Sequence, residues 1–322
     1  MGKSTIAGKC SRLLSSSLSG GDWIREVNNT PEDETLEYRK LLLIRPNSNF
    51  ALMISADNLP FPSPSFLRNH SYPTNKPPAN LSLALSRLGY TTGILDMDIF
   101  GPSIPTLFDL SSPDLSPELN AQNQLLPLTA YGVKTMSIGY LLGSESSAIV
   151  WRGPMLLKAI QQLLHEVDWS HPSLDVLVLD LPPGTGDTQL SIAQQVVVDG
   201  AVIVTTPHTL AIKDAVKGVN MFQKVNIPIL GVVQNMSVFC CPGCGEETHV
   251  FGRTEKTKKV CGEMGMEFLG DVPLHPRIGE DGGRGKPTVV GDPGGREAEV
   301  FMGLGRKVAG LVGLPEMPVG RT

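Results

Sequence analysis

An acidic residue at the end of an unbroken apolar run is the clearest chemical signal in this chain. The run covers residues 176–179, and Asp180 ends it before a Pro- and Gly-rich turn. Such a run predicts a strand buried on both faces of a parallel sheet, and ligands of open α/β sheets bind at the carboxyl ends of their strands. An acid there can hold a Mg²⁺-bound water beside a nucleotide phosphate that faces the backbone N–H groups of Gly184 and Gly186. The simpler interpretation is a tight strand-to-helix turn with a capping Asp.

The phosphate-binding loop that normally accompanies such an acid is not recognisable upstream of it. A Walker A loop reads G-x-x-x-x-G-K-[ST] and curls several backbone N–H groups around phosphate at a helix N-terminus. Only residues 2–5, Gly-Lys-Ser-Thr, carry the end of this motif. No apolar strand precedes them and no first glycine stands five residues before Gly2, so we do not expect this tetrapeptide to bind phosphate.

Cys241 and Cys244 form a second candidate site, for a metal. Their two-residue spacing lets both sulfurs face one metal, and soft thiolates select zinc or iron–sulfur clusters. A closed site needs four ligands, which two such pairs could supply in a two-fold dimer. Alternatively Cys240, His249 or Cys261 completes a zinc site within one chain, or the pair acts as a redox dithiol.

Composition limits the classes of protein to which the chain can belong. Its 322 residues are 41% hydrophobic, which suffices for one large core or two modest ones. A net charge of −5 provides no electrostatic basis for nucleic-acid binding, and no apolar run approaches the length of a membrane span. Five cysteines, three of them within residues 240–244, indicate metal or redox chemistry in a reducing compartment rather than a disulfide framework.

The chain divides near residue 78. Residues 1–21 are basic, rich in Ser and free of acids, which is typical of a mitochondrial transit peptide or of a disordered tail. We therefore expect the mitochondrial matrix, with the cytoplasm as the alternative. Residues 22–78 are irregular and end in a Pro-rich linker, although residues 41–44 and 50–55 could be two short strands.

From residue 79 to residue 313, predicted helices and strands alternate. Helices are predicted over 80–88, 191–198, 211–224 and 256–264, with another within 151–166; strands are predicted over 92–98, 201–206, 229–234 and 268–272, besides the one ending at Asp180. This order predicts an α/β fold with a doubly wound, mostly parallel sheet and helices on both faces. A metal loop at 240–249 lies within this domain, and 314–322 form a tail.

Five segments resemble, in their order and spacing, the Mrp/ApbC family of iron–sulfur cluster carrier ATPases. These are P-loop NTPases of the deviant Walker A (SIMIBI) type, and the similarity is strongest to the mitochondrial NUBPL branch, which serves assembly of respiratory complex I. Residues 95–103 resemble switch I, and residues 179–187 resemble Walker B with switch II. The other three segments are 151–154 (Trp-Arg-Gly-Pro), 234–237 (Gln-Asn-Met-Ser) and 241–244 (Cys-Pro-Gly-Cys).

The resemblance implies a role for each matching residue. It assigns Mg²⁺ binding and positioning of the attacking water to four acids, Asp96, Asp98, Asp180 and Asp187. It assigns contacts with adenine to two residues at strand ends, Asn235 and Pro207. It implies ATP as a cofactor and a labile [4Fe–4S] cluster bridging a homodimer through Cys241 and Cys244. The cluster would pass to iron–sulfur apoproteins such as complex I subunits. Arg152 would hold phosphate or form a salt bridge.

The chain departs from this family where the P-loop should be. Counting back from Asn80, the P-loop Lys, Ser and Thr fall on Thr74, Asn75 and Lys76, and the preceding Gly falls on Pro73. None of them matches, and proline cannot donate an N–H to phosphate. Residues 41–78 are thus either a replaced or a mis-joined segment. A nucleotide-dead, metal-binding dimer is the alternative to an ATPase, and we expect this chain to bind ATP poorly.

Overall fold

A mostly parallel sheet forms the centre of the protein. The structure is a computed structural model, and it describes residues 50–56, 76–99, 101–112, 114–141, 153–182, 187–241 and 243–317. The sheet has eight strands in the order β10-β7-β6-β1-β5-β2-β4-β3, and β3 alone runs antiparallel to its neighbour. The strands are β1 (Phe50–Ala56), β2 (Thr92–Asp96), β3 (Leu128–Ala130), β4 (Val133–Ser137), β5 (Val176–Leu181), β6 (Gly200–Thr205), β7 (Ile229–Gln234) and β10 (Phe268–Asp271). The predicted doubly wound sheet is confirmed.

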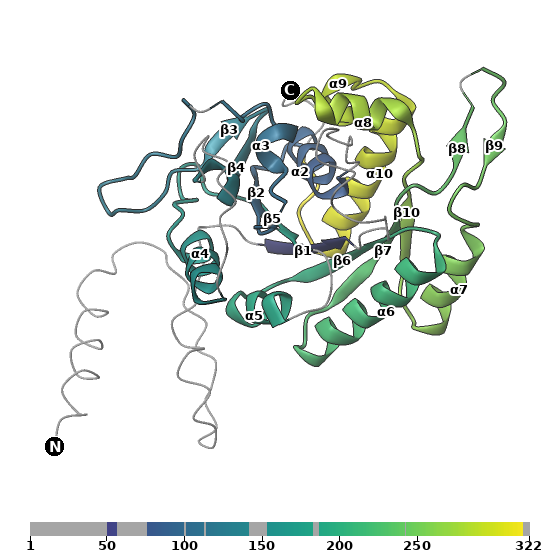
Figure 1. Cartoon of the computed structure of the whole chain (residues 1–322), viewed down its shortest axis with the longest axis horizontal. Coiled ribbons are helices and arrows are strands. Elements are labelled where there is room, and N and C mark those ends of the chain that lie inside the picture. The colour runs from purple at the N-terminus through teal and green to yellow at the C-terminus, as the bar shows by residue number, and fades with distance from the viewer. Residues whose placement is uncertain are drawn as a thin grey trace. The chain divides into compact units, whose positions relative to one another are not determined.

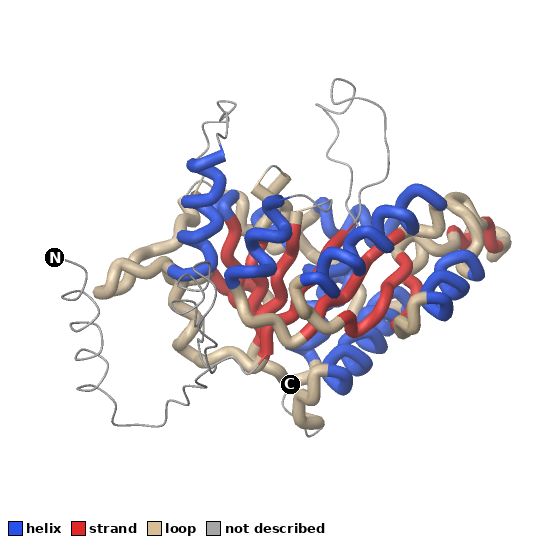
Figure 2. Tube along the Cα trace, turned by 90° about the horizontal axis from the view of Figure 1, so that it is seen from below, coloured by secondary structure: helices blue, strands red, loops and turns tan. Residues whose placement is uncertain are grey.

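Helices cover both faces of this sheet (Figures 1 and 2). One face carries α2 (Pro77–Arg87), α3 (Ile104–Leu107), α8 (Pro276–Gly283), α9 (Thr288–Gly291) and α10 (Arg296–Leu311). The other face carries α4 (Gly153–His165), α5 (Asp187–Gln195), α6 (Thr209–Lys224) and α7 (Glu255–Glu263). A short 3₁₀ helix, η2 (Ile138–Tyr140), follows β4. None of the helices in the described ranges is long and apolar enough to cross a membrane.

The strands β5 and β6 are buried along their whole length, as their largely apolar sequences predicted. Val178 packs into the core under α2 and α10, whereas the next residue, Leu179, packs into the core under α4 to α6. This alternation follows from the two-residue period of a strand. Side chains at even positions of β5 therefore point toward α2, and Asp180 is one of them.

The strand in the middle of the sheet, β1, lies outside the domain that the sequence predicted to begin at residue 79. It pairs in parallel with β5 on one side and with β6 on the other. The sequence indicated residues 50–55 only as a possible short strand in an irregular region, because no P-loop motif follows it. Its pairing register, with Ile54 opposite Asp180, brings its carboxyl end to the sheet edge where Asp180 lies.

Several predicted boundaries differ from the observed ones. The helix predicted over 80–88 begins at Pro77, because proline has the backbone angle of a first helical residue and needs no N–H there. The strand predicted over 92–98 ends at Asp96, and the helix predicted over 191–198 occupies Asp187–Gln195. The predicted strand at 41–44, the proposed transit peptide at 1–21 and Arg152 lie outside the described residues.

Candidate functional sites: an acidic cluster and a cysteine hairpin

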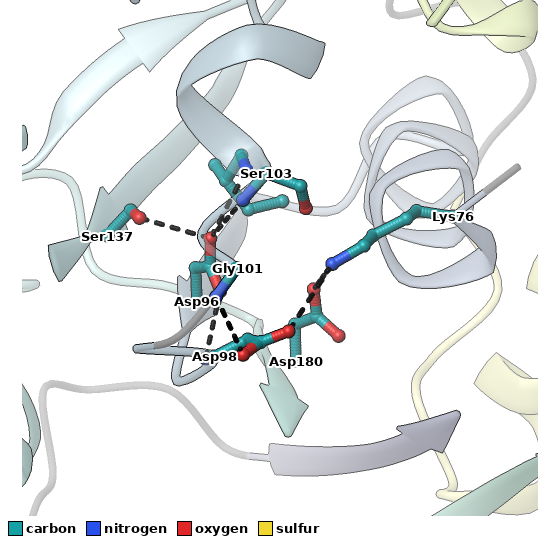
Figure 3. A network of polar contacts seen from close by, with 8 residues as sticks. Lys76, Asp96, Asp98, Gly101, Ser103, Ser137 and Asp180 are labelled. Carbon is teal, nitrogen blue, oxygen red and sulfur yellow. Dashed lines mark hydrogen bonds and ion pairs between the residues drawn. The ribbon is translucent and has the colours of Figure 1, made fainter. Parts of the chain in front are cut away.

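Two adjacent strand ends bring three of the predicted acids together. Asp96 and Asp180 are directly opposite each other in the parallel pairing of β2 with β5, so both side chains point to the α2 face of the sheet. Asp98 follows two residues after the end of β2. Figure 3 shows the three carboxyl groups grouped at this edge, which is the expected location of a ligand in an open α/β sheet.

Asp96 is fully buried and uses both oxygens inside the protein. Its Oδ1 accepts a hydrogen bond from the Asp98 N–H at 3.0 Å. Its Oδ2 accepts from the N–H groups of Ser103 and Ile104, at 3.0 and 3.2 Å, and from the Ser137 hydroxyl at 3.0 Å. Burial raises the Asp96 pKa, against the effects of Lys76 and of the N–H donors. This carboxylate joins β2 to β4 and to the start of α3.

Lys76 brings a positive charge to the cluster from the residue that precedes α2. Its Nζ lies 3.8 Å from Asp180 Oδ2 and 4.0 Å from Asp98 Oδ2 (Figure 3). Burial disfavours the ammonium, but Asp180, Asp96 and Asp98 together outweigh that effect and raise the Lys76 pKa. The resemblance to the family implied no role for Lys76, which falls at a mismatched position. A lysine directly before Pro-Pro at the start of a helix was the signal in the sequence.

Asp180 is the least satisfied member of the cluster. It is 2% exposed, and its Oδ2 has no hydrogen-bond partner. Burial is the main cause that raises its pKa to about 7, with repulsion from Asp96 and Asp98 adding to the shift and Lys76 opposing it. Asp98 is more exposed, and its Oδ1 accepts from the Gly101 N–H at 3.1 Å. The ammonium of Lys76 is therefore the main charge partner of Asp180.

The two residues predicted to contact adenine lie at neighbouring strand ends. Asn235 follows β7 and donates its N–H to the carbonyl of Thr205, the last residue of β6, at 2.7 Å; its Oδ1 accepts from the Met236 N–H at 3.0 Å. Pro207 lies two residues beyond β6 and is buried. The adenine contact itself stays a prediction. Asp187 begins α5, while Gly184 and Gly186 lie outside the described residues.

Cys241 and Cys244 lie in the turn of a two-stranded hairpin, β8 (Phe239–Cys240) and β9 (Glu247–Thr248). The hairpin stands clear of the other labelled elements in Figure 1. Two backbone hydrogen bonds shape the turn, from the Cys241 N–H to the Glu246 carbonyl at 2.9 Å and from the Gly245 N–H to the Cys241 carbonyl at 2.8 Å. The N–H groups of Cys244 and Gly243, and then the Cys244 thiol, lower the Cys241 pKa. A lowered pKa favours the thiolate, which is the metal-binding form.

The other candidate ligands of a one-chain zinc site do not gather around this pair. Cys261 lies in α7 and is 3% exposed, packed in the core beneath α6 and α7. Cys240 donates its thiol to the Gly245 carbonyl at 3.5 Å, and His249 is exposed. Within the part of the chain that the structure describes, no third His, Cys, Asp or Glu side chain joins Cys241 and Cys244 in a group that could hold a metal ion.

The family of the chain follows from a match to a known family model. Residues 77–309 match the family model described as ParA, NUBPL iron-transfer P-loop NTPase. The chain belongs to this family. The match begins directly after Lys76, so the segment in which a P-loop would be expected lies outside it.

Relatives of the chain are named as iron–sulfur cluster transfer or carrier proteins. The chain is 48% identical over 229 residues to the iron–sulfur cluster transfer protein NUBPL of Dictyostelium discoideum, which covers 71% of this chain and 69% of that one. It is 42% identical over 234 residues to the iron–sulfur cluster carrier protein of Aquifex aeolicus, which covers 73% of this chain and 63% of the relative. The chain thus spans less than two thirds of the Aquifex protein.

Solved structures agree on the fold. A nucleotide-binding protein from Archaeoglobus fulgidus, solved in complex with ADP, superposes with a TM-score of 0.62 at 30% identity, covering 78% of this chain and 91% of that one. The cell division ATPase MinD of Pyrococcus furiosus superposes with a TM-score of 0.58 at 20% identity, covering 81% and 99%. At that identity the MinD likeness concerns the fold alone.

Within this P-loop NTPase family, the start of α2 in the present chain is unusual. A P-loop holds phosphate with backbone N–H groups at the start of the helix that follows it. Here the first two residues of that helix are Pro77 and Pro78, which have no N–H. The ammonium of Lys76 lies between the acids that would hold a divalent cation. These residues do not fit a Mg²⁺–nucleotide complex of the usual P-loop kind.

Proposed function

We propose that this protein carries a [4Fe–4S] cluster as cargo, bound between two copies of the chain through Cys241 and Cys244 of each. The observation that carries the proposal is the cysteine pair in the turn of the β8–β9 hairpin. There the Cys244 side chain is exposed, and the surrounding donors lower the Cys241 pKa. Thiolates in a small turn suit iron–sulfur ligation.

A dimer supplies what one chain lacks. One pair gives two sulfur ligands, whereas a [4Fe–4S] cluster takes four, and a two-fold axis beside the hairpin would bring the second pair. A cluster held at exposed turns can be reached by an acceptor protein. We infer delivery to iron–sulfur apoproteins, in keeping with the names of the relatives. We further propose that subunits of respiratory complex I are among the acceptors, as the resemblance to the NUBPL branch implies, and that the protein is located in the mitochondrial matrix, for which the basic, acid-free residues 1–21 are the support.

Anaerobic reconstitution with iron and sulfide tests the cluster. We expect a broad absorbance at roughly 400 nm and about four irons per dimer. Cys241→Ser and Cys244→Ser should each abolish both signals. Cys240→Ser is the matched control, because this thiol lies next to the pair but bonds to the Gly245 carbonyl, and it should leave the iron content unchanged. A colourless protein that retains one zinc per monomer would contradict the cluster.

A second candidate differs only in the role of nucleotide. Membership of a P-loop NTPase family favours a carrier that hydrolyses ATP. The two prolines at the start of α2 and the ammonium among the acids favour a metal-binding dimeric module without ATPase activity. Binding of Mg-ATP by the unmodified chain separates the two, and little binding is expected of the module without ATPase activity.

A further inference from the structure

The acidic cluster contains its own cation. Three carboxyl groups meet at the carboxyl ends of β2 and β5, and the Lys76 Nζ lies within 4.0 Å of two of them. Buried carboxylates in such proximity repel one another unless a positive charge lies between them. In P-loop enzymes a divalent metal ion fills that need.

Within the cluster, Asp180 has the strongest need for a cation. Asp96 is satisfied by four hydrogen-bond donors from the protein itself, and Asp98 has the Gly101 N–H. Asp180 Oδ2 is buried without a donor, and Lys76 is its ion-pair partner. An oxygen of this kind is the one that would ligate a metal ion, and the ammonium already faces it.

We propose that Lys76 is an internal substitute for the divalent cation: its ammonium neutralises Asp98 and Asp180 and keeps Mg²⁺ out of the acidic cluster. The side chain reaches this position because Lys76 immediately precedes Pro77, so that the start of α2 presents it to the ends of β2 and β5. A magnesium ion bound to Asp180 Oδ2 at about 2.1 Å would lie within a few ångströms of the ammonium, and two cations that close repel strongly. This inference deepens the candidate without ATPase activity and does not depend on cluster binding by the cysteines.

Manganese binding tests the proposal with a spectroscopic signal that needs no enzymatic activity. The full nucleotide-free chain is titrated with Mn²⁺, a magnesium surrogate whose free ion gives an electron paramagnetic resonance signal that disappears on binding. We expect no Asp180-dependent Mn²⁺ site in the wild type. Lys76→Met, of similar length and without charge, should bind one Mn²⁺ at least ~10-fold more tightly than the wild type does. Adding Asp180→Asn to Lys76→Met should remove that site.

Two further variants separate charge from folding. Lys217→Met is the matched control, since it removes an exposed lysine that pairs with Asp214 on α6, a helix of the face of the sheet opposite α2, and it should bind Mn²⁺ as the wild type does. Lys76→Arg keeps the charge and should also behave as the wild type. If Lys76→Met does not fold, the wild type still decides: one tightly bound Mn²⁺ that is lost in Asp180→Asn would overturn the proposal. Equal Mn²⁺ affinity in the wild type and Lys76→Met would overturn it as well.

Discussion

Replacing Asp96 tests whether this acid organises the edge of the sheet. Its carboxylate accepts four hydrogen bonds from residues that belong to β4, to the start of α3 and to the loop after β2. Asp96→Ala removes both acceptor oxygens, and with them all four hydrogen bonds. Two of the donors, the Ile104 N–H and the Ser137 hydroxyl, take part in buried hydrogen bonds, so water cannot easily replace the carboxylate there.

The magnitude follows from these contacts. A buried donor left without an acceptor costs about 1–3 kcal/mol, so the two buried donors alone give about 2–6 kcal/mol. We expect Asp96→Ala to lower the free energy of unfolding by about 4 kcal/mol. Asp96→Asn keeps one carbonyl oxygen, which can still serve the three donors now at Oδ2, and should cost about 1–2 kcal/mol because only the bond from the Asp98 N–H is lost.

Urea denaturation at pH 8 provides the measurement, and Asp98→Ala provides the matched control. Asp98 accepts one exposed hydrogen bond, from Gly101, and its ion-pair partner Lys76 keeps Asp180 as a second partner, so the loss of the Asp98 side chain should cost at most about 1 kcal/mol. The order Asp96→Ala, Asp96→Asn, Asp98→Ala is the expected order of destabilisation. The reasoning is refuted if Asp96→Ala lies within about 1 kcal/mol of the wild type, or if Asp98→Ala costs as much as Asp96→Ala.

Three further predictions concern nucleotide, location and acid sensitivity. Calorimetry on the unmodified chain should detect little Mg-ATP binding, because several charge-assisted hydrogen bonds of about 1.5–3 kcal/mol each are missing. Grafting Gly-Lys-Gly-Gly-Val-Gly-Lys-Ser-Thr before Ala79 should restore Mg-ATP binding. Micromolar affinity without the graft would contradict this reasoning. A fluorescent fusion of the full chain should enter mitochondria, and deletion of residues 1–21 should leave it in the cytosol; cytosolic fluorescence from the full fusion would count against a transit peptide. Hydrogen bonds from Ser170 lower the Asp168 pKa, so this group stabilises the fold above its unfolded pKa of about 3.9 and loses that contribution as the pH falls through its lower folded value. Asp168→Asn should therefore lose less stability on acidification than the wild type, and parallel acid-denaturation curves would contradict this.

Much of the fold was predictable because strands such as β5 and β6 are buried on both faces. The largely apolar segments at 176–181, 201–206 and 229–234 can satisfy both layers of helices only as inner strands of a parallel sheet, and the structure places them there. Asp180 could be located for the same reason, since a buried run that ends in an acid puts that acid at the edge of the sheet. The location of Cys241 and Cys244 in one turn was predictable from their spacing alone, because two residues separate them in the chain.

The partners of the acids depended on contacts between segments far apart in the chain. The sequence by itself places Asp96 and Asp180 at strand ends. Only the pairing of β2 with β5 puts them opposite each other. Only the packing of β4 and α3 supplies the buried hydrogen-bond donors that satisfy Asp96. The position of β1 in the middle of the sheet was decided by its neighbours β5 and β6, because seven residues without a following P-loop carry no distinctive local signal. The resemblance gave Lys76 no role, because this residue stands where the P-loop of the family has a threonine. Its role emerged only when α2 packed against the sheet, since an ammonium has a strong effect on carboxylates within about 4 Å and little effect on those beyond the screening length of salt.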